Sequence, residues 1–448
     1  MIDKPSSGTS IRSKAAWYLL AILVAAYVLS YVDRYSLALF TGEISRDLGL
    51  TDSHMGLLVG AGFAIVYSLA GVPVAWWLDS HSRRNAVAVG IVIWSLATIT
   101  SGFSTGFWML LILRSFVALG EAVLTPGAMS LIGDTFPSHK RALPVAIYST
   151  VSSVMVTGSY VFTAGALVVA TSLTTEFDVA AWRLTLMLIG VPGVLIAIML
   201  VLTTREPRRG TYDNTDITLT VASANAISNR QFLDYLRSHS RLFFAFFLYL
   251  GMIGTVTMAN AVWMPTVLVR RFGYSAEEAG FFFGAMTIPG ALLGITLWSI
   301  LASGILKRDG RVGGLWKLLL GGLILTAPFA TTAPVAPNLA ICLTAIALAP
   351  IGLATGSVIT ALIVQELAPS PVRARLFALS LLFANIFGMT LGPLVAPLVV
   401  SGLGLPDSSI GIGVALSAAV CLSVAIIVLV SFRKEFRLVD NARKDLKW

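Results

Sequence analysis

The stretch from Leu29 to Phe40 reads LSYVDRYSLALF and places a carboxylate and a guanidinium inside an otherwise apolar segment. It belongs to an apolar run from Trp17 to Thr41 that is long enough to cross a bilayer as one helix. A charge near the middle of a bilayer is costly, so Asp33 and Arg34 are expected to face a protein interior or a wet cavity rather than lipid. We therefore expect a membrane helix whose charged pair marks a functional site.

The composition extends this interpretation to the whole chain. Of 448 residues, 56% are hydrophobic and only 12% are charged, which is far from the balance of a soluble domain. Apolar runs of about 20 residues or more, the length a bilayer requires, recur at 17–41, 54–78, 85–104, 107–133, 142–171, 182–203, 241–269, 277–303, 314–332, 338–365, 374–401 and 410–432. We predict an all-α membrane protein with twelve transmembrane helices.

A polar stretch divides the twelve segments into two groups of six. The predicted parts are a tail at 1–16, a first six-helix bundle at 17–203, a linker at 204–240, a second bundle at 241–432 and a tail at 433–448. Within the linker, Phe232, Tyr235 and Leu236 fall on one helical face, which indicates a short amphipathic helix at the membrane surface.

The distribution of positive charge sets the expected orientation. All but six of the 31 Lys and Arg residues fall in the tails, the linker and the loops on their side of the membrane. The positive-inside rule therefore predicts that both termini are cytoplasmic. The net charge of +9 is explained by this membrane-surface pattern, so we expect the bilayer, and no nucleic acid, as a partner.

The two halves also resemble each other. The sequence Leu48-Gly49-Leu50-Thr51 matches Phe272-Gly273-Tyr274-Ser275, and Asp134-x-x-Pro137-Ser138-x-x-Arg141 matches Glu366-x-x-Pro369-Ser370-x-x-Arg373. Chance similarity between small-residue helices is the alternative, but the matches include loop prolines and charges. We therefore expect two pseudo-symmetric bundles, as in transporters built from parallel repeats.

The loop after the second segment, 75–84, reads AWWLDSHSRR and resembles the major facilitator signature G-x-L-x-D-R-x-x-R-R. Ala75 and Ser80 depart from the signature, whereas Asp79, Arg83 and Arg84 keep it. An aspartate at a helix end beside two arginines can hold the positive end of a neighbouring helix dipole, so we predict a cytoplasmic gate at these three residues. The alternative is that the two arginines only follow the positive-inside rule.

The fourth segment carries a second pair of charges. Arg114 and Glu121 are seven residues apart, so two helical turns place them on one face, about 10 Å apart along the axis. With Asp33 and Arg34 they make four charges inside the membrane. The alternative to a functional role is a static salt-bridge cluster, but buried ion pairs are a costly way to hold helices together.

Three motifs in the first half resemble the Spinster branch of the major facilitator superfamily. They are Tyr31-Val32-Asp33-Arg34-Tyr35, Arg114 with Gly120-Glu121-Ala122, and Ile132-Gly133-Asp134-x-Phe136. The resemblance implies a bacterial inner-membrane exporter of sphingosine-1-phosphate, lysophospholipids or related lipids. It also places the family's charges in the first and fourth helices on Asp33, Arg34, Arg114 and Glu121.

These charges suggest a division of roles. We expect Asp33 or Glu121 to exchange protons, with Asp33 favoured because it lies beside Arg34 in mid-helix, and Arg34, Arg114 and Tyr31 to contact substrate. The matching positions in the second half are Thr257 and Met258, which are uncharged.

The second bundle offers aromatic and small polar side chains for the neutral part of a ligand. The candidates are Tyr249, Asn260, Trp263 and Asn385. For each of them, ordinary helix packing or interhelical hydrogen bonding is the favoured alternative.

Enzymatic functions find little support in the sequence. The four histidines lie in loops or at helix ends, and the sequence has no G-x-x-x-x-G-K-[ST] run. We expect no enzyme, no metal and no cofactor, but a monomeric, gradient-driven transporter of an amphiphilic, anionic, lipid-like solute. A proton-coupled drug or metabolite exporter is one alternative, and a non-transporting membrane sensor or lipid scramblase is another.

Overall fold

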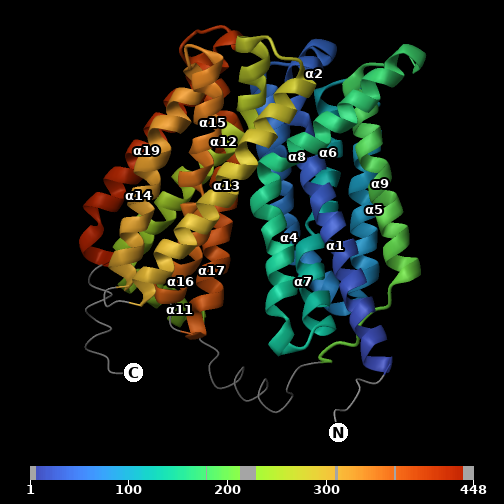
Figure 1. Ribbon diagram of the computed structural model, residues 1–448, viewed down its shortest axis with the longest axis vertical. Coiled ribbons are helices and arrows are strands. Elements are labelled where there is room, and N and C mark those ends of the chain that lie inside the picture. Colours follow the sequence, from blue (N-terminus) through green and yellow to red (C-terminus); the bar gives the residue numbers. More distant parts are fainter. Residues whose placement is uncertain (1–6, 178, 212–228, 308–310, 368–369, 437–448) are drawn as a thin grey trace. The chain divides into compact units, whose positions relative to one another are not determined.

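The computed structural model describes residues 7–177, 179–211, 229–307, 311–367 and 370–436 (Figure 1). Within these ranges the chain is helical and has no strand, so the predicted all-α class is confirmed. Much of the predicted linker and most of the C-terminal tail lie outside the described residues.

Twelve helical segments in the described part of the chain are long and apolar enough to cross a membrane. They are Lys14–Leu39, Asp52–Gly71, Arg83–Ser101, Phe107–Thr135, Ala142–Thr174, Ala181–Thr203, Ser240–Phe272, Ala276–Leu306, Val312–Val335, Leu339–Leu367, Arg375–Gly402 and Asp407–Ser431. The predicted number and order of spans are therefore confirmed.

The chain divides into two compact units: unit 1 comprises residues 1–50 and 65–219, and unit 2 comprises 51–64 and 220–448. The helices of unit 1 are α1 (Ser7–Leu39), α2 (Thr41–Leu48), most of α4 (Gly62–Ser80), α5 (Arg83–Ser101), α6 (Phe107–Glu121), α7 (Leu124–Thr135), η2 (Ser138–Lys140), α8 (Ala142–Phe177) and α9 (Ala181–Thr203). Those of unit 2 are α3 (Asp52–Gly56), η1 (Leu57–Ala61), α11 (Asn229–Ser238), α12 (Ser240–Phe272), α13 (Ala276–Leu306), α14 (Arg311–Thr332), η3 (Ala333–Val335), α15 (Leu339–Leu353), α16 (Thr355–Leu367), α17 (Ser370–Asn385), η4 (Ile386–Leu391), α18 (Gly392–Gly402), η5 (Asp407–Ser409) and α19 (Ile410–Ser431).

The repeated sequence has the same local structure at both positions. Gly49 and Gly273 each follow a helix in the left-handed region, with φ of 65° and 73°, where a side chain would be strained. Two residues later, Thr51 and Ser275 each cap the next helix by accepting a hydrogen bond from a backbone N–H in its first turn. The two matching sequences therefore form the same type of turn between helices.

Residues 51–64 belong to unit 2 because small residues let this segment approach α18 closely. A Cβ atom on Gly56 would lie 2.6 Å from the carbonyl oxygen of Pro393, so only glycine fits there. The segments η1 and η4 are both π-helical, and they pack against each other. The predicted first bundle, 17–203, includes residues 51–64, whereas the structure groups these residues with unit 2.

In unit 1, α5 packs against α6 and α9, and α1 packs against α8 and α9. Every residue of α1 from Ser30 to Leu39 is buried, including Asp33 and Arg34. The charged residues therefore face protein rather than lipid, as the cost of a charge in hydrocarbon requires.

Unit 2 is held by a large apolar core drawn from α12, α14, α16 and α19. The predicted amphipathic helix is present as α11, and its apolar residues Phe232, Tyr235 and Leu236 pack against this core. The Tyr235 hydroxyl also donates a hydrogen bond of 2.7 Å to the Leu367 carbonyl. This apolar face is therefore partly covered by the protein itself. The position of this helix at the membrane surface stays a prediction.

Candidate functional site

The four predicted membrane charges meet inside unit 1. Asp33 and Arg34 come from α1, and Arg114 and Glu121 come from one face of α6. None of the four is more than 8% exposed. The sequence spacing thus located a real cluster, which we call the interior charge cluster.

Within the cluster the ion pairs form between helices. Arg34 Nε donates to Glu121 Oε2 at 3.1 Å, and Arg34 Nη2 contacts the same oxygen. Arg114 Nη1 lies 3.4 Å from Asp33 Oδ1, and Arg114 Nη2 donates to the Arg34 carbonyl at 3.1 Å. Asp33 therefore pairs with Arg114 and not with adjacent Arg34, because successive residues of a helix do not face each other.

The two carboxylates have different surroundings. Thr98 on α5 donates a hydrogen bond to Asp33 Oδ2, while Arg114 lies at Oδ1. Glu121 receives both contacts of Arg34 on Oε2, and its Oε1 has no hydrogen-bond partner among the described residues. Asp33 is thus held by one cation and one neutral hydroxyl, whereas Glu121 is held by one cation alone.

Tyrosine rings surround Arg34. Its guanidinium carbon lies 5.0 Å from the ring centre of Tyr31 and 5.3 Å from that of Tyr67. Tyr31 packs in turn against Tyr27 and Tyr35. These cation–π contacts stabilise the charge of Arg34 in addition to Glu121. The sequence singled out Tyr31 but missed Tyr67, which no motif connects to Arg34.

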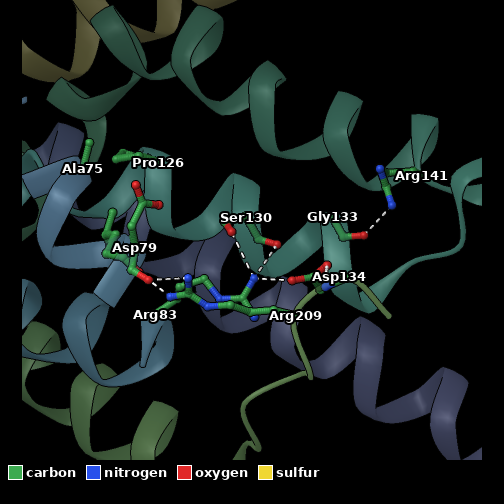
Figure 2. A pocket seen from close by; sticks show the side chains of 11 residues that line it. Ala75, Asp79, Arg83, Pro126, Ser130, Gly133, Asp134, Arg141 and Arg209 are labelled. Carbon is green, nitrogen blue, oxygen red and sulfur yellow. Dashed lines mark hydrogen bonds and ion pairs between the residues drawn. The ribbon is translucent and has the colours of Figure 1, made fainter. Parts of the chain in front are cut away.

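A second charged set lies at the end of unit 1 where α4, α5 and α7 meet the chain leaving α9 (Figure 2). Arg83 forms an ion pair with Asp134, donates to Ser130 Oγ at 3.0 Å, and lies 3.1 Å from Glu206 Oε1. These groups border a pocket of 410 Å³ that is also lined by Asp79, Arg141 and Arg209. The predicted gate residue Arg83 is thus a hub within its own unit.

Glu206 is the other carboxylate that contacts Arg83, and no sequence motif predicted its role. Its carboxylate accepts hydrogen bonds from Ser82 Oγ at 2.7 Å and from the backbone N–H groups of Arg83 and Arg84 at 3.1 and 2.8 Å. It therefore caps the positive N-terminus of α5. Partial burial raises the pKa of Glu206, but these hydrogen bonds outweigh it and hold that pKa below its ordinary value.

The other two predicted gate residues differ from Arg83. Arg84 donates to the carbonyls of Thr204 at 2.6 Å and Val201 at 3.2 Å, so it fastens the end of α9. Asp79 is exposed, and its backbone carbonyl accepts a hydrogen bond from Arg209. The role of Asp79 in holding a neighbouring helix stays a prediction.

The four candidates of unit 2 do not gather at one point. Tyr249 and Trp263 lie on α12, fourteen residues and about 21 Å apart, and both are fully buried. Trp263 Nε1 donates to the Pro393 carbonyl, and Asn260 Nδ2 donates to Val256 in its own helix. Asn385 is exposed at the end of α17. The geometry gives Trp263 and Asn260 the packing and hydrogen-bonding roles favoured above.

Unit 2 also holds an ion pair that the sequence did not predict. Arg270 on α12 contacts both carboxylate oxygens of Asp52 at 2.6 Å and donates to the Asp407 carbonyl at 2.7 Å. Asp52 is 4% exposed. The two residues are far apart in sequence, so only the fold brings them together.

Among the described residues, no group of three or more His, Cys, Asp or Glu side chains could hold a metal ion. The two cysteines, Cys342 and Cys421, are free and buried in unit 2. The interior charge cluster contains ion pairs, the Thr98 hydroxyl and aromatic rings.

The family model of the Major Facilitator Superfamily matches residues 23–393. An MFS-type efflux pump of Mycolicibacterium smegmatis is 27% identical over 87% of this chain and 86% of its own length. A D-galactonate transporter of Escherichia coli is 26% identical over 86% and 88%. Protein spinster homolog 3 of Danio rerio is 29% identical over 67% of this chain and 60% of its own length.

A solved structure of a bacterial homolog to the human lysosomal transporter Spinster superposes with a TM-score of 0.79. It covers 97% of this chain and 98% of that chain, at 24% sequence identity. The superposition establishes a shared fold over essentially the whole chain.

Proposed function

Because the chain belongs to the Major Facilitator Superfamily and is a transporter of that family, we propose that it moves an amphiphilic, anionic, lipid-like solute by proton-coupled alternating access. The proposal rests on one observation, the interior charge cluster of unit 1. Asp33, Arg34, Arg114 and Glu121 are all buried, and their charges sum to zero when both carboxylates are ionised.

A proton would change that balance. Protonating Asp33 leaves a net charge of +1 and releases Arg114 from its carboxylate partner, while Arg34 keeps Glu121. An anionic group is then attracted by the same event that takes up the proton. By linkage, an anion that binds the protonated state more tightly must raise the affinity of the site for the proton by the same factor. A cationic solute would instead compete with the proton.

The lipid-like character of the solute is supported by apolar aromatic surface. In unit 2, Phe247 stacks on Phe383 with 4.6 Å between ring centres, and Phe383 stacks on Phe387 at 5.8 Å. All three side chains are only partly buried. Such rings suit a hydrocarbon chain.

The relatives favour a second candidate, a polar organic acid. The D-galactonate transporter matches 86% of the chain and the efflux pump 87%. A sugar acid such as galactonate also carries the single carboxylate that a released arginine would bind. This candidate uses the same charge cluster but does not need the apolar rings.

Uptake into proteoliposomes with an imposed pH gradient tests the proposal. The probes are a fluorescent lysophosphatidic acid analogue, radiolabelled D-galactonate and the cationic dye ethidium. We expect gradient-driven accumulation of the lysolipid, abolished in Asp33→Asn, with Glu121→Gln identifying the other carboxylate if Asp33→Asn remains coupled. Accumulation of galactonate or ethidium instead would assign the chain to the sugar-acid or drug class, and simple equilibration of lipid between leaflets would assign it to the scramblases.

The proposal includes an orientation. We expect both termini to lie on the cytoplasmic side of a bacterial inner membrane, because the basic residues concentrate on that side. We also expect the chain to act as a monomer. A reporter fused before Met1 or after Trp448 should give a cytoplasmic signal, and an external signal from either would overturn this topology.

A further inference from the structure

Thr98 on α5 faces Asp33 from a helix that contributes no charge to the interior charge cluster. Its side-chain oxygen contacts two acceptors, Asp33 Oδ2 and the carbonyl of Trp94 at 2.9 Å. All three residues are 1% exposed. A hydroxyl carries one proton and two lone pairs, so Thr98 can donate to only one of these acceptors at a time.

The two contacts match the two protonation states of Asp33. When Asp33 is ionised, Thr98 donates its proton to Oδ2 and its lone pairs face the Trp94 carbonyl without a bond. When Oδ2 carries a proton, that proton is donated to the Thr98 oxygen, and the Thr98 proton turns to the Trp94 carbonyl. Rotation of the Thr98 hydroxyl therefore gives Asp33 a hydrogen bond in both protonation states, with no movement of heavy atoms.

We propose that Thr98 is the positioning residue that lets Asp33 hold a proton and give it up while both stay buried. The inference rests on the proposed function, in which Asp33 is the proton carrier. The inference adds Thr98 on α5 to a site formed by charged residues of α1 and α6, and it gives this neutral side chain a function beside the four charged ones.

Glu121 shows what is missing without such a partner. Its Oε2 is taken up by Arg34, and its Oε1 has no hydrogen-bond partner among the described residues. A proton placed on Oε1 would have no acceptor there, and an unsatisfied buried donor is destabilising. The geometry thus favours Asp33 over Glu121 as the place where the proton is kept.

The charged groups of the cluster around Asp33 are Arg114 and Glu121 from α6 and Arg34 from α1. Because Thr98 is neutral, replacing it leaves these charges in place, so its effect can be measured separately from theirs.

Three substitutions isolate the hydroxyl. Thr98→Val keeps the shape and removes both hydrogen bonds, and Thr98→Ser keeps the hydroxyl. Thr185→Val on α9 is the matched control, because Thr185 is equally buried and its hydroxyl donates to the Ala181 carbonyl of its own helix at 2.8 Å.

Loss of the Thr98 hydroxyl should favour the protonated state of Asp33. A hydrogen bond to an ionised carboxylate is stronger than one from a neutral carboxyl group, so Thr98→Val weakens the ionised state more. We expect the pH midpoint for protonation of Asp33 to rise by about 0.5 to 1 unit. Thr98→Ser should restore it, and Thr185→Val should leave it unchanged.

The measurement is an infrared pH titration of the full chain in lipid, which needs no substrate. The stretching band of a protonated carboxyl group that disappears in Asp33→Asn is assigned to Asp33. A raised midpoint in Thr98→Val, reversed in Thr98→Ser, supports the inference, and an unchanged midpoint overturns it. If Asp33→Asn keeps every such band, Asp33 does not titrate and the inference is overturned, whereas gradient-driven uptake that is lost in Glu121→Gln would leave the proposed proton coupling standing on Glu121. If Thr98→Val does not fold, the same titration of Thr98→Ala applies.

Discussion

The interiors of the two units differ in the kind of polar group they bury. Unit 1 encloses two carboxylates and two guanidinium groups deep within its spans. In the described part of unit 2, the buried carboxylate of Asp52 lies at the very end of its span and pairs with Arg270. The side chains of Ser and Thr buried deeper in the spans are neutral, and most of them bond to a carbonyl of their own helix, as Thr326 does to Gly322. A hydroxyl satisfied in this way keeps its charge state at any physiological pH. We therefore expect a change of internal charge by one proton to occur in unit 1 and not among the buried hydroxyls of unit 2.

This contrast predicts the largest effect for breaking an ion pair in unit 1. Glu121→Leu leaves Arg34 buried without its carboxylate and should lower the free energy of unfolding by about 3 to 5 kcal/mol. Thermal unfolding in detergent would measure it. The double variant Arg34→Leu/Glu121→Leu should recover most of the loss, because no charge is then left uncompensated. A double variant as unstable as Glu121→Leu would contradict the ion-pair explanation.

A steric change in unit 2 should have the next largest effect. Gly56→Ala places a Cβ atom 2.6 Å from the Pro393 carbonyl oxygen, which forces the backbones apart. We expect a loss of about 1 to 3 kcal/mol, as for other overpacked sites. Gly71→Ala is the control, because a Cβ at Gly71 meets nothing within 4 Å. Equal stability of the two variants would argue against the close approach of η1 to α18.

Removing the charge that caps α5 should have a smaller effect. Glu206→Gln loses the anion at the helix N-terminus, and because the side chain is 29% exposed, solvent screens the loss to about 1 kcal/mol or less. The pKa of Glu206 lies below its ordinary value of 4.5, so its stabilisation is complete above that value and is lost as pH falls through the folded-state value. Unfolding curves of the two proteins should therefore converge in acid, and a difference that persists there would count against the charge.

A surface ion pair of unit 2 should contribute least. Asp234 and Arg237 lie 3.7 Å apart, and their side chains are 59% and 78% exposed. Asp234→Asn should change the melting temperature by less than can be measured, because exposed pairs are screened by water and salt. A clear destabilisation would mean that exposure alone does not separate the ion pairs of the two units.

The sequence was sufficient for the fold and for the charged residues of the site, since both depend on rules that act along one helix. The length of apolar runs defines a span, and the separation of seven residues puts Arg114 and Glu121 on one face. The choice of partners was not predictable, because it depends on how helices rotate against each other. Asp33 lies beside Arg34 in sequence yet pairs with Arg114, and Thr98 belongs to no motif that connects it to Asp33.

The same limit explains the ion pair between Asp52 and Arg270. Each residue appears in the sequence as an ordinary loop or helix-end charge, and the two are separated by 218 positions. Only the close packing of 51–64 within unit 2 brings them into contact. A comparison of relatives that revealed paired changes at these positions would have been the signal needed to find it.

The segment from Thr204 to Gly210 has a mechanical consequence. Arg84 holds the Thr204 carbonyl, Glu206 binds the N-terminus of α5, Arg209 binds carbonyls at the end of α4, and the Gly210 N–H donates to Asp134 on α7. Tension applied to the chain after Thr211 is therefore shared among three helix ends before it reaches α9. We expect a pull on this part of the chain to move the ends of α4, α5 and α7 together, instead of unwinding α9 from its C-terminal end.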